Sequence, residues 1–390
     1  MIVKSILANI FLFLILISLT GCGAARKEAT GPAGDIRARH EPLLAILPIQ
    51  NYSATPAPLH DLRQTFAERL RQQGIRLLPD EELEAFMARH RLRHVGGIGR
   101  EISMAFAEEA DVDGVIITYL EEYRKKGPPK LSMMARLITT AGLPMVVWMD
   151  GISFAGNETP GLLGLGLEDD IHVLEKRALA QLAFSLAGHF AGQPPLGVKQ
   201  AKQETEEVDT RPTIQYKSPK LRVEKRHTVA IMPFLNESER RFAGELIGLH
   251  FLQHMVTSPE EYGVIEPGVV RNELLASRVV IPYGLSVADD SLLFSQLDAD
   301  LLLSGTVIDY TDPGGENMPS VYFIVYAIAR QGYEMVWSSH SINSGDDGLH
   351  LFGLGRIHTA AKLSSQMTGK VVQMLALPRE LWFPAKEALP

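Results

Sequence analysis

The chain contains a single cysteine, Cys22, which is the only thiol available for chemistry. A disulfide needs two thiols, so no bridge can form within the chain, even in an oxidising compartment. A metal site built from several cysteines is excluded for the same reason. Any chemistry at Cys22 is therefore a modification of this one sulfur, and the folded part must be stabilised by burial of its core.

Acidic pairs and a late histidine cluster are further groups that could do chemistry. Asp111 with Asp113, and Asp298 with Asp300, are spaced to act as acid and base or to bind a cation. Their place directly before apolar runs favours turn and strand-starting roles. A transition-metal site is suggested by His340, Asp346, Asp347, His350 and His358. Their spacings are mixed and match no recognisable ligand pattern, so we predict no metal and no cofactor.

A glycine-rich run precedes a helical pattern, as a phosphate-binding loop does: Gly161-Leu162-Leu163-Gly164-Leu165-Gly166. Its apolar filling and the missing Lys-Ser/Thr ending favour a tight turn instead. No Gly-x-Ser-x-Gly elbow occurs in the chain. We therefore expect no catalytic site and a protein that is not an enzyme. A hydrolase remains the opposing interpretation, and it would require a nucleophile and a base within hydrogen-bond reach.

The first residues have the pattern of an export signal. Lys4 supplies a positive charge, and an apolar run from Ile6 to Ile17 follows, interrupted by Asn9. A run of about a dozen residues is shorter than the roughly 20 that span a bilayer as a helix. We therefore predict a signal peptide at residues 1–21 and exclude it from the folded part.

The signal ends in Leu19-Thr20-Gly21-Cys22, which resembles the lipobox of bacterial lipoproteins. The resemblance implies cleavage before Cys22 and a lipid anchor, with palmitate among its acyl chains, on the new end of the chain. An ordinary signal peptide with an incidental cysteine, or an uncleaved anchor, are the alternatives. Gly23 follows Cys22 where an Asp would favour the inner membrane. By the sorting rule of enteric lipoproteins, this implies an outer-membrane lipoprotein that faces the periplasm.

The composition is that of a folded protein without affinity for nucleic acid. Hydrophobic residues make up 46% of the 390 residues and charged residues 22%, with a net charge of −8. A mildly acidic chain without a basic block lacks the clustered Lys and Arg that neutralise phosphates. Nucleic acid is therefore not expected as a partner.

Two segments of the chain match each other. The run from Ala45 to Ser53 aligns with the run from Ala230 to Ser238, with Ala, Ile, Pro, Asn and Ser at the same places. The match stays in register through an acidic turn, a hairpin and a Gly-Leu-Gly run, so we predict a duplicated unit. The repeated motif residues are Pro48, Asn51 and Trp148, and Pro233, Asn236 and Trp337. The histidine cluster is not repeated, because Gly151, Glu158 and Gly161 stand near the matching places.

The predicted organisation places two similar domains after a tether. We expect a flexible tether at 22–41, domains at 42–191 and 227–378, a polar linker at 192–226 and a tail at 379–390. Each unit shows a strand, an amphipathic helix, a second short strand and helix, an apolar strand, a hairpin and a closing helix. This order predicts an α/β fold of two tandem mixed-sheet sandwich domains, which the linker lets move separately.

The strand with Ala-Ile-Leu-Pro or Ala-Ile-Met-Pro-Phe, followed by Asn and Ser, resembles the opening of TolB amino-terminal-type domains. The acidic turn before an apolar strand and the hairpin with Trp148 or Trp337 continue this resemblance, which extends to CsgG-like periplasmic lipoproteins. The resemblance implies a non-enzymatic adaptor, assembly factor or pore subunit. The hairpins offer about 10 residues per strand and no spare segment for a pore, so channel formation is not expected.

These observations predict a membrane-anchored, non-catalytic adaptor or assembly factor for an envelope complex. Its expected partners are the membrane, through the lipid, and an envelope protein. Two tethered copies would raise avidity for a repeated partner, and a homo-oligomer is an open possibility. The alternative function is a sensor that binds a small molecule or glycan between the two domains.

Overall fold

The computed structural model describes residues 36, 41–93, 95–158, 167–193, 195, 209–219, 221, 226–258, 261–278, 287–314, 317–348 and 356–376. Contacts divide the chain into residues 1–34 and one compact unit of residues 35–390, to which all the described residues belong. Within the described ranges, no helix is both long enough and apolar enough to cross a bilayer.

The first half of this unit is a mixed sheet with helices on it. Its elements are β1 (Leu43–Ile46), β2 (Gln50–Asn51), α2 (Leu59–Gln72), β3 (Arg76–Leu77), α3 (Asp80–Arg89), α4 (Arg100–Ala110), β4 (Gly114–Arg124), β5 (Lys130–Thr139), β6 (Met145–Ala155) and α5 (Ile171–Phe190). Strands β1, β3 and β4 are parallel, whereas β4, β5 and β6 form an antiparallel meander. The parallel part is connected through α2 and through α3 with α4, because parallel strands need long crossovers.

The second half repeats this order of elements. It contains β8 (His227–Ile231), β9 (Leu235–Asn236), α7 (Ala243–Val256), β10 (Tyr262–Ile265), α8 (Pro267–Ala276), α9 (Val287–Leu297), β11 (Leu301–Thr311), β12 (Ser320–Ala329), β13 (Glu334–Ser344) and α10 (Ala360–Ala376). The strand order β3-β1-β4-β5-β6 of the first half has its counterpart in β10-β8-β11-β12-β13. The two halves therefore share one topology.

Equivalent acidic residues tie equivalent strands in both halves. The carboxylate of Asp113 accepts a hydrogen bond from the backbone N–H of Leu43, and that of Asp300 accepts one from Thr228, each at 2.9 Å. Asp111 and Asp298 have left-handed backbones, with φ of 49° and 53°. The pairs thus lie at the entry to β4 and β11, where the sequence predicts turn roles.

The halves join edge to edge into one mixed sheet. Val264 and Ile265 of β10 pair antiparallel with Val146 and Met145 of β6. Among the described residues, the result is a 13-stranded sheet in which β2 and β9 are short side strands on β4 and β11. The predicted α/β class with mixed sheets is confirmed. The expectation that the two domains move separately does not fit a shared sheet, whereas the domain limits stay predictions.

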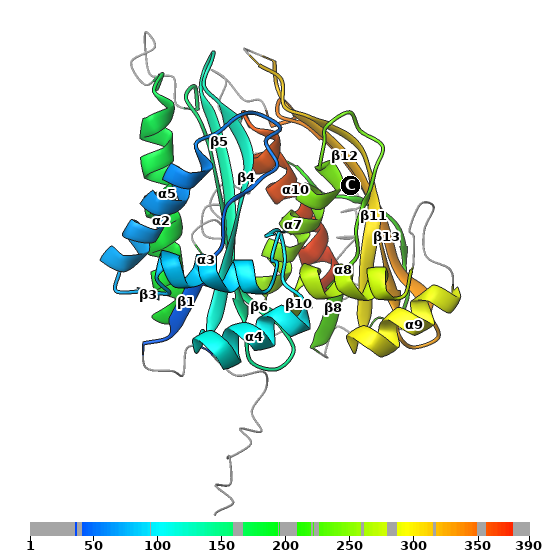
Figure 1. Cartoon of the computed structure of the whole chain (residues 1–390). Helices are drawn as coiled ribbons and strands as arrows, with labels where there is room; N and C mark the ends of the chain where they lie inside the picture. Colours follow the sequence, from blue (N-terminus) through cyan, green and yellow to red (C-terminus); the bar gives the residue numbers. More distant parts are fainter. Residues whose placement is uncertain are drawn as a thin grey trace, which may run out of the picture. The chain divides into compact units, whose positions relative to one another are not determined.

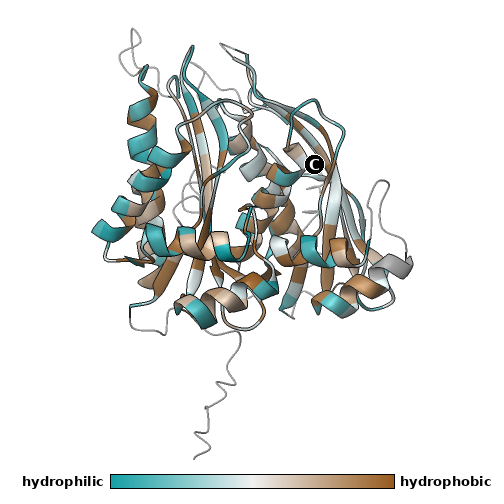
Figure 2. Cartoon of the chain, viewed as in Figure 1, coloured by the Kyte–Doolittle hydropathy of each residue, from teal (hydrophilic) through white to brown (hydrophobic). Residues whose placement is uncertain are grey.

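Helices and strands alternate in layers across the unit (Figure 1). Helices α2 and α5 lie on one side of β4–β6, and helices α7 and α10 lie between β4–β6 and β11–β13. Helix α7 is mostly apolar and almost wholly buried, because it packs against both parts of the sheet. Helix α2 is amphipathic, and its outer side is hydrophilic (Figure 2). The position of each helix therefore matches its hydrophobic pattern.

Three elements differ from the sequence-based expectation. Helices α4 and α9 were not predicted, and in α4 only Ser103 and Phe106 are buried, too few to produce an apolar period. Strand β7 (Thr213–Lys217) lies inside the predicted linker and pairs antiparallel with β13. An edge strand is held by backbone hydrogen bonds along one side, so the polar sequence of β7 gave no strand signal.

Candidate functional site

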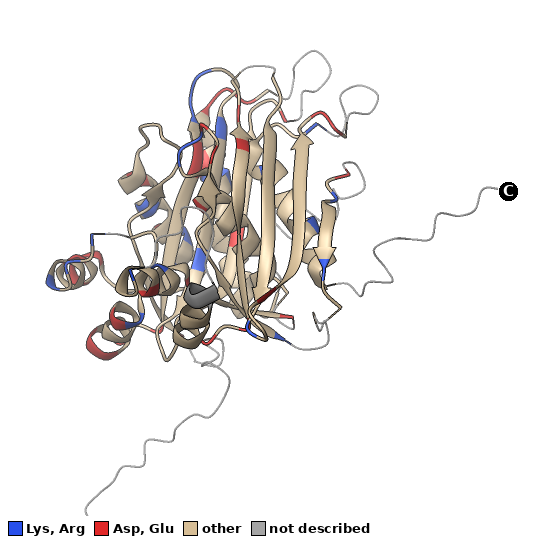
Figure 3. Cartoon of the chain, turned by 90° about the vertical axis from the view of Figure 1, so that its right-hand side faces the viewer, with Lys and Arg blue, Asp and Glu red and all other residues tan. Residues whose placement is uncertain are grey.

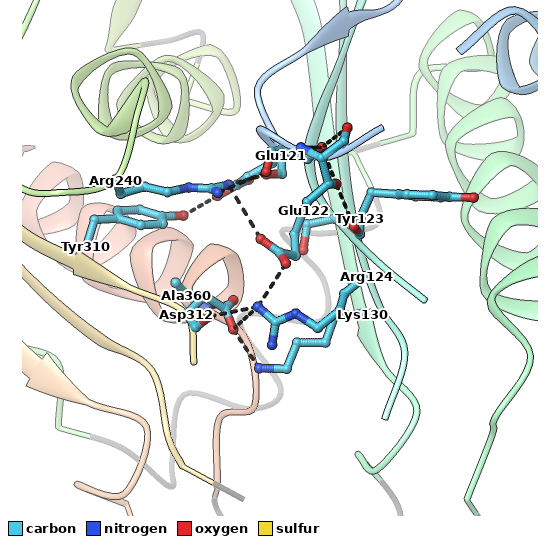
Figure 4. Close-up of polar contacts among 12 residues, drawn as sticks. Glu121, Glu122, Tyr123, Arg124, Lys130, Arg240, Tyr310, Asp312 and Ala360 are labelled. Carbon is cyan, nitrogen blue, oxygen red and sulfur yellow. Dashed lines mark hydrogen bonds and ion pairs between the residues drawn. The ribbon is translucent and has the colours of Figure 1, made fainter. Parts of the chain in front are cut away.

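Charged side chains gather where the two halves face each other, and we call this cluster the charged junction (Figure 4). It is formed by Glu121, Glu122, Arg124 and Lys130 of the first half and by Arg240, His250, Tyr310 and Asp312 of the second. The first four residues come from the hairpin end of β4 and β5. The others come from the turn before α7, the middle of α7, the end of β11 and the loop after it. Each side chain therefore reaches across the boundary between the halves.

Lys130 and Asp312 form a buried ion pair at one end of the charged junction. Lys130 Nζ lies 2.6 Å from Asp312 Oδ1, and the two side chains are 3% and 5% exposed. Asp312 Oδ2 also accepts a hydrogen bond of 2.8 Å from the backbone N–H of Ala360, the first residue of α10. A carboxylate at a helix N-terminus is stabilised by the helix dipole, so Asp312 links β5, β11 and α10.

Two arginines hold Glu122 between the halves. Arg124 donates to Glu122 Oε1 at 3.0 Å, and Arg240 lies 3.4 Å from Glu122 Oε2. Arg124 also donates to the backbone carbonyls of Asp312 and Pro313, each at 2.7 Å. Arg240 does the same toward the first half, with bonds to the carbonyls of Ser53 and Glu121.

Glu121 is the buried acceptor at the other end of the charged junction. Its Oε1 accepts a hydrogen bond from the Tyr310 hydroxyl and lies 3.2 Å from His250 Nε2. Glu121, His250 and Tyr310 are 2%, 3% and 3% exposed. Glu121 Oε2 has no hydrogen-bond partner among the described residues. Burial and the neighbouring carboxylate raise the pKa of Tyr310, so its hydroxyl stays protonated and donates.

A second buried pair, Arg136 with Glu266, joins β5 to the start of α8. Arg136 Nη2 lies 2.7 Å from Glu266 Oε1 and Arg136 Nε lies 2.9 Å from Glu266 Oε2, a two-pronged contact with both side chains fully buried. The Tyr119 hydroxyl contacts Arg136 Nη1 and donates to the carbonyl of Gly96 at 2.6 Å. Burial lowers the pKa of Arg136, but the combined effects of Glu266, Tyr119 and Tyr52 outweigh it and raise the pKa above its usual value.

The carboxyl group of Glu122 in the charged junction has a raised pKa. Burial, with a further contribution from Asp312, raises its pKa from 4.5 to about 7, against the opposing effect of Arg124, Arg240 and Lys130. Glu122 therefore changes its charge near neutral pH. Its side chain is only 7% exposed and lies between the halves. A change of its charge therefore alters the ion pairs that hold the halves together.

The charged junction is arranged to hold the halves together. Its acids and bases bond to one another or to backbone carbonyls, which offsets the cost of their burial. Among the described residues, no group of three or more His, Cys, Asp or Glu is placed to hold a metal ion. Of the suggested metal cluster, His350 lies outside the described residues, Asp346 pairs with Arg356, and Asp347 accepts bonds from Asn343 and Ser344 in a turn.

The motif residues predicted from the repeat lie in two equivalent sets. Pro48 and Pro233 connect β1 to β2 and β8 to β9, and Asn51 and Asn236 accept bonds from the N–H of Ser53 and Ser238 in matching turns. Trp148 and Trp337 are 1% and 0% exposed in the core. The structure does not bring these six residues into one site. Leu19, Thr20, Gly21 and Cys22, the run 161–166 and the matching Gly353-Leu354-Gly355 lie outside the described residues.

The sequence interpretation did not predict the residues of the charged junction or the Arg136–Glu266 pair. Lys130 and Arg136 stand in an otherwise apolar strand, and a buried charge in such a strand must find a partner. Strand register makes Ser320 and Tyr326 of β12 their counterparts, so neither charge belongs to the repeated pattern. The signal that could have identified these residues is a charged residue at a position where the other copy of the repeat has an uncharged one.

The fold and the buried ion pairs define an α/β protein. Its two equivalent halves are held in one relative position by a shared sheet and by these ion pairs. No protein-family model matches the chain, and no curated protein does. Among solved structures, the PelC dodecamer of Paraburkholderia phytofirmans is 19% identical and covers 43% of this chain and 99% of its own, with a TM-score of 0.30. Lipoprotein GNA1162 of Neisseria meningitidis is 17% identical over 37% of this chain and 98% of its own, with a TM-score of 0.28.

The C-terminal domain of LpoB from Salmonella enterica is a further similar structure. It is 12% identical and covers 29% of this chain and 82% of its own, with a TM-score of 0.26. Each of the three likenesses spans less than half of this chain. At these TM-scores none of them supports a conclusion about what the protein does.

Proposed function

We propose that this chain is a lipid-anchored, non-catalytic adaptor or assembly factor that faces the periplasm from the outer membrane. The lipobox pattern at Leu19-Thr20-Gly21-Cys22 supports the anchor. The TolB amino-terminal or CsgG-like character inferred from the repeated motifs supports an envelope role without catalysis.

The observation that carries the proposal is that the charged residues gathered by the fold pair with one another across the boundary between the halves. The acids and bases that the fold gathers, including the buried pairs Lys130–Asp312 and Arg136–Glu266, bond across the boundary between the halves. Such pairing fixes the relative position of two equivalent domains. A rigid body of this kind presents a constant surface to a protein partner, and little binding free energy is lost to ordering it.

In-cell crosslinking of the intact protein, followed by purification and mass spectrometry, tests the proposal. A Cys22→Ala variant is the matched control, because it keeps the folded part and removes the acceptor of the lipid. We expect a defined envelope protein to be recovered with the unaltered chain and to be reduced or lost with the control.

The opposite result would favour the sensor. If no protein partner is recovered, and the purified soluble part retains a small molecule or glycan in native mass spectrometry, the adaptor proposal fails. If a partner is recovered in equal yield with and without Cys22, the adaptor role is supported, and the lipid anchor is not required for binding.

A further inference from the structure

One face of the second-half sheet is covered at one end by α8 and α9, and the rest of it is left uncovered by the described residues. Along β12, the side chains of Val321, Phe323 and Val325 are fully buried against α7 and α10, whereas the alternating residues between them are partly exposed. Strand register places six larger residues on this second face, Tyr216, Tyr322, Ile324, Tyr326, His340 and Ile342, together with the small Ser304, Thr306 and Ser338. We call them the open face; Figure 3 looks onto this side, where the strands carry mostly uncharged residues.

The same face of the first half is covered. The counterparts of Ile324 and Tyr326 in the register of β5 are Met134 and Arg136, which are 1% and 0% exposed. Helix α7 of the second half packs on that side of the first-half sheet. On the open face, Ile342 is 65% exposed and Tyr216 is 43% exposed. An apolar and aromatic sheet face of this kind is unusual on the surface of a soluble protein and indicates a contact that is not yet accounted for.

The end of α10 lies at the edge of the open face. Lys217 of β7 donates through Nζ to the backbone carbonyls of Leu375 and Met374, at 3.3 and 3.5 Å. These bonds hold the last turn of α10 beside β7, the outermost strand at this end of the sheet. Successive side chains of a strand point to opposite faces, so Lys217 turns toward α10 while its neighbour Tyr216 turns toward the open face.

The sequence that follows α10 contains a short run of large apolar residues, which could pack on an apolar surface. Residues 377–390 contain Leu381-Trp382-Phe383 between Pro378 and Pro384. The two prolines disfavour a continuing helix and favour extended backbone in the residues before them. The seven residues from Ala376 to Phe383 reach at most about 24 Å when extended, more than the ~20 Å of two layer spacings from α10 to the far side of the sheet. The segment is therefore long enough to pass around the edge of β7.

We propose that Leu381-Trp382-Phe383 packs on the open face of its own chain, beside Tyr216, Tyr326 and Ile342. Trp and Phe each bury about 150–250 Å² in such contacts, and they favour aromatic neighbours. The segment then covers for the second half the face that α7 covers for the first. A protein that binds the open face must displace this segment.

Cysteine pairing tests the position of the segment. The chain expressed without residues 1–21 and with Cys22→Ser has no thiol, so two cysteines can be introduced without interference. Tyr216→Cys with Phe383→Cys is the test pair. Gln64→Cys with Phe383→Cys is the control pair, because Gln64 is exposed on α2. Under mild oxidation we expect an intramolecular disulfide, seen as a faster monomer band without reductant, in the test pair and none in the control.

A second measurement uses no cysteine. Removal of residues 377–390 should expose the open face and increase the fluorescence of 8-anilinonaphthalene-1-sulfonate at least threefold, while the circular dichroism spectrum stays unchanged. Ile342→Asp in the shortened chain should reverse most of that increase. The proposal is overturned if the disulfide forms only between molecules, if both pairs oxidise at the same rate, or if shortening leaves the dye signal unchanged.

Discussion

Arg136 on β5 and Glu266 at the start of α8 form a fully buried, two-pronged ion pair between residues 130 positions apart in the sequence. Arg136 Nη2 and Glu266 Oε1 are separated by 2.7 Å, and Glu266 also accepts bonds from the backbone N–H of Ile98 and Gly268. The carboxylate thus serves both halves and caps α8. A pair this well bonded offsets its own cost of burial, and it makes the relative position of the halves specific.

Removal of one member of this pair should destabilise the whole unit. Arg136→Met leaves Glu266 buried without its cation, and we expect the free energy of unfolding to fall by about 3–5 kcal/mol. Urea denaturation of the soluble chain, followed by circular dichroism, measures this change.

The double variant Arg136→Met with Glu266→Gln is the control for that experiment. Because it removes both charges and keeps a side-chain oxygen for the N–H groups of Ile98 and Gly268, it should recover much of the lost stability. If the double variant is less stable than Arg136→Met, the ion pair is not the source of the loss.

The two halves should stay together after the chain between them is cut. They share strand pairing between β6 and β10 and the buried ion pairs Lys130–Asp312 and Arg136–Glu266. A protease site placed within residues 196–208 allows the cut, and gel filtration then reports the size of the product. We expect both fragments to elute together at the position of the uncut chain, whereas separate elution in native buffer would contradict a fixed arrangement.

Glu122 should make stability depend on pH near neutrality. Its pKa is raised from 4.5 to about 7 by burial and by Asp312, so the folded protein keeps a proton that the unfolded chain releases. The stabilisation from this proton is complete below pH 4.5 and is lost as the pH rises through about 7. The difference in unfolding free energy between Glu122→Gln and the unaltered chain should therefore rise by about 1–3 kcal/mol from pH 5 to pH 8.

Denaturation curves at several pH values measure this difference. Glu84→Gln, an exposed carboxylate on α3, is the control and should show no such trend. A difference that is constant or that falls with pH for Glu122→Gln would show that its carboxyl group is ionised throughout this range.

The equivalent acids Asp113 and Asp300 should matter to a similar degree. Each carboxylate accepts a bond of 2.9 Å from a backbone N–H at the start of a neighbouring strand. Replacement of either by Ala leaves that N–H without its acceptor, and we expect each variant to lose about 1.5–3 kcal/mol in thermal or urea unfolding. Glu84→Ala, which removes an exposed carboxylate beyond the first turn of α3, should change the free energy of unfolding by less than about 0.5 kcal/mol. Markedly unequal losses at Asp113 and Asp300 would argue against equivalent roles in the two halves.

Cys22 should decide whether the protein is held at a membrane. Cells grown with labelled palmitate should incorporate the label into the unaltered chain and not into Cys22→Ala, because only the thiol accepts the lipid. Fractionation should move the variant from the membrane to the soluble fraction. Label retained by Cys22→Ala would contradict the lipobox interpretation.

The sequence predicted most of the regular elements because their signals are local. The apolar period of α2 and α10 and the alternation in β12 are visible within single segments, and so is the recurrence of the Pro48 and Asn51 motif at Pro233 and Asn236. Helix α4 was missed because its few buried residues leave no apolar period, and β7 was missed because an edge strand depends on its partner rather than on its own residues.

The sequence by itself determined the α/β class, the repeated order of elements and the single thiol at Cys22. Only the tertiary structure decided that the halves share one sheet and which charges meet: Arg136 with Glu266 and Lys130 with Asp312. The physical reason is the range of each interaction. Backbone geometry and hydrophobic period act over a few neighbouring residues, whereas a buried charge reveals only that it needs a partner. Which residue provides that partner depends on how segments far apart in the chain pack together.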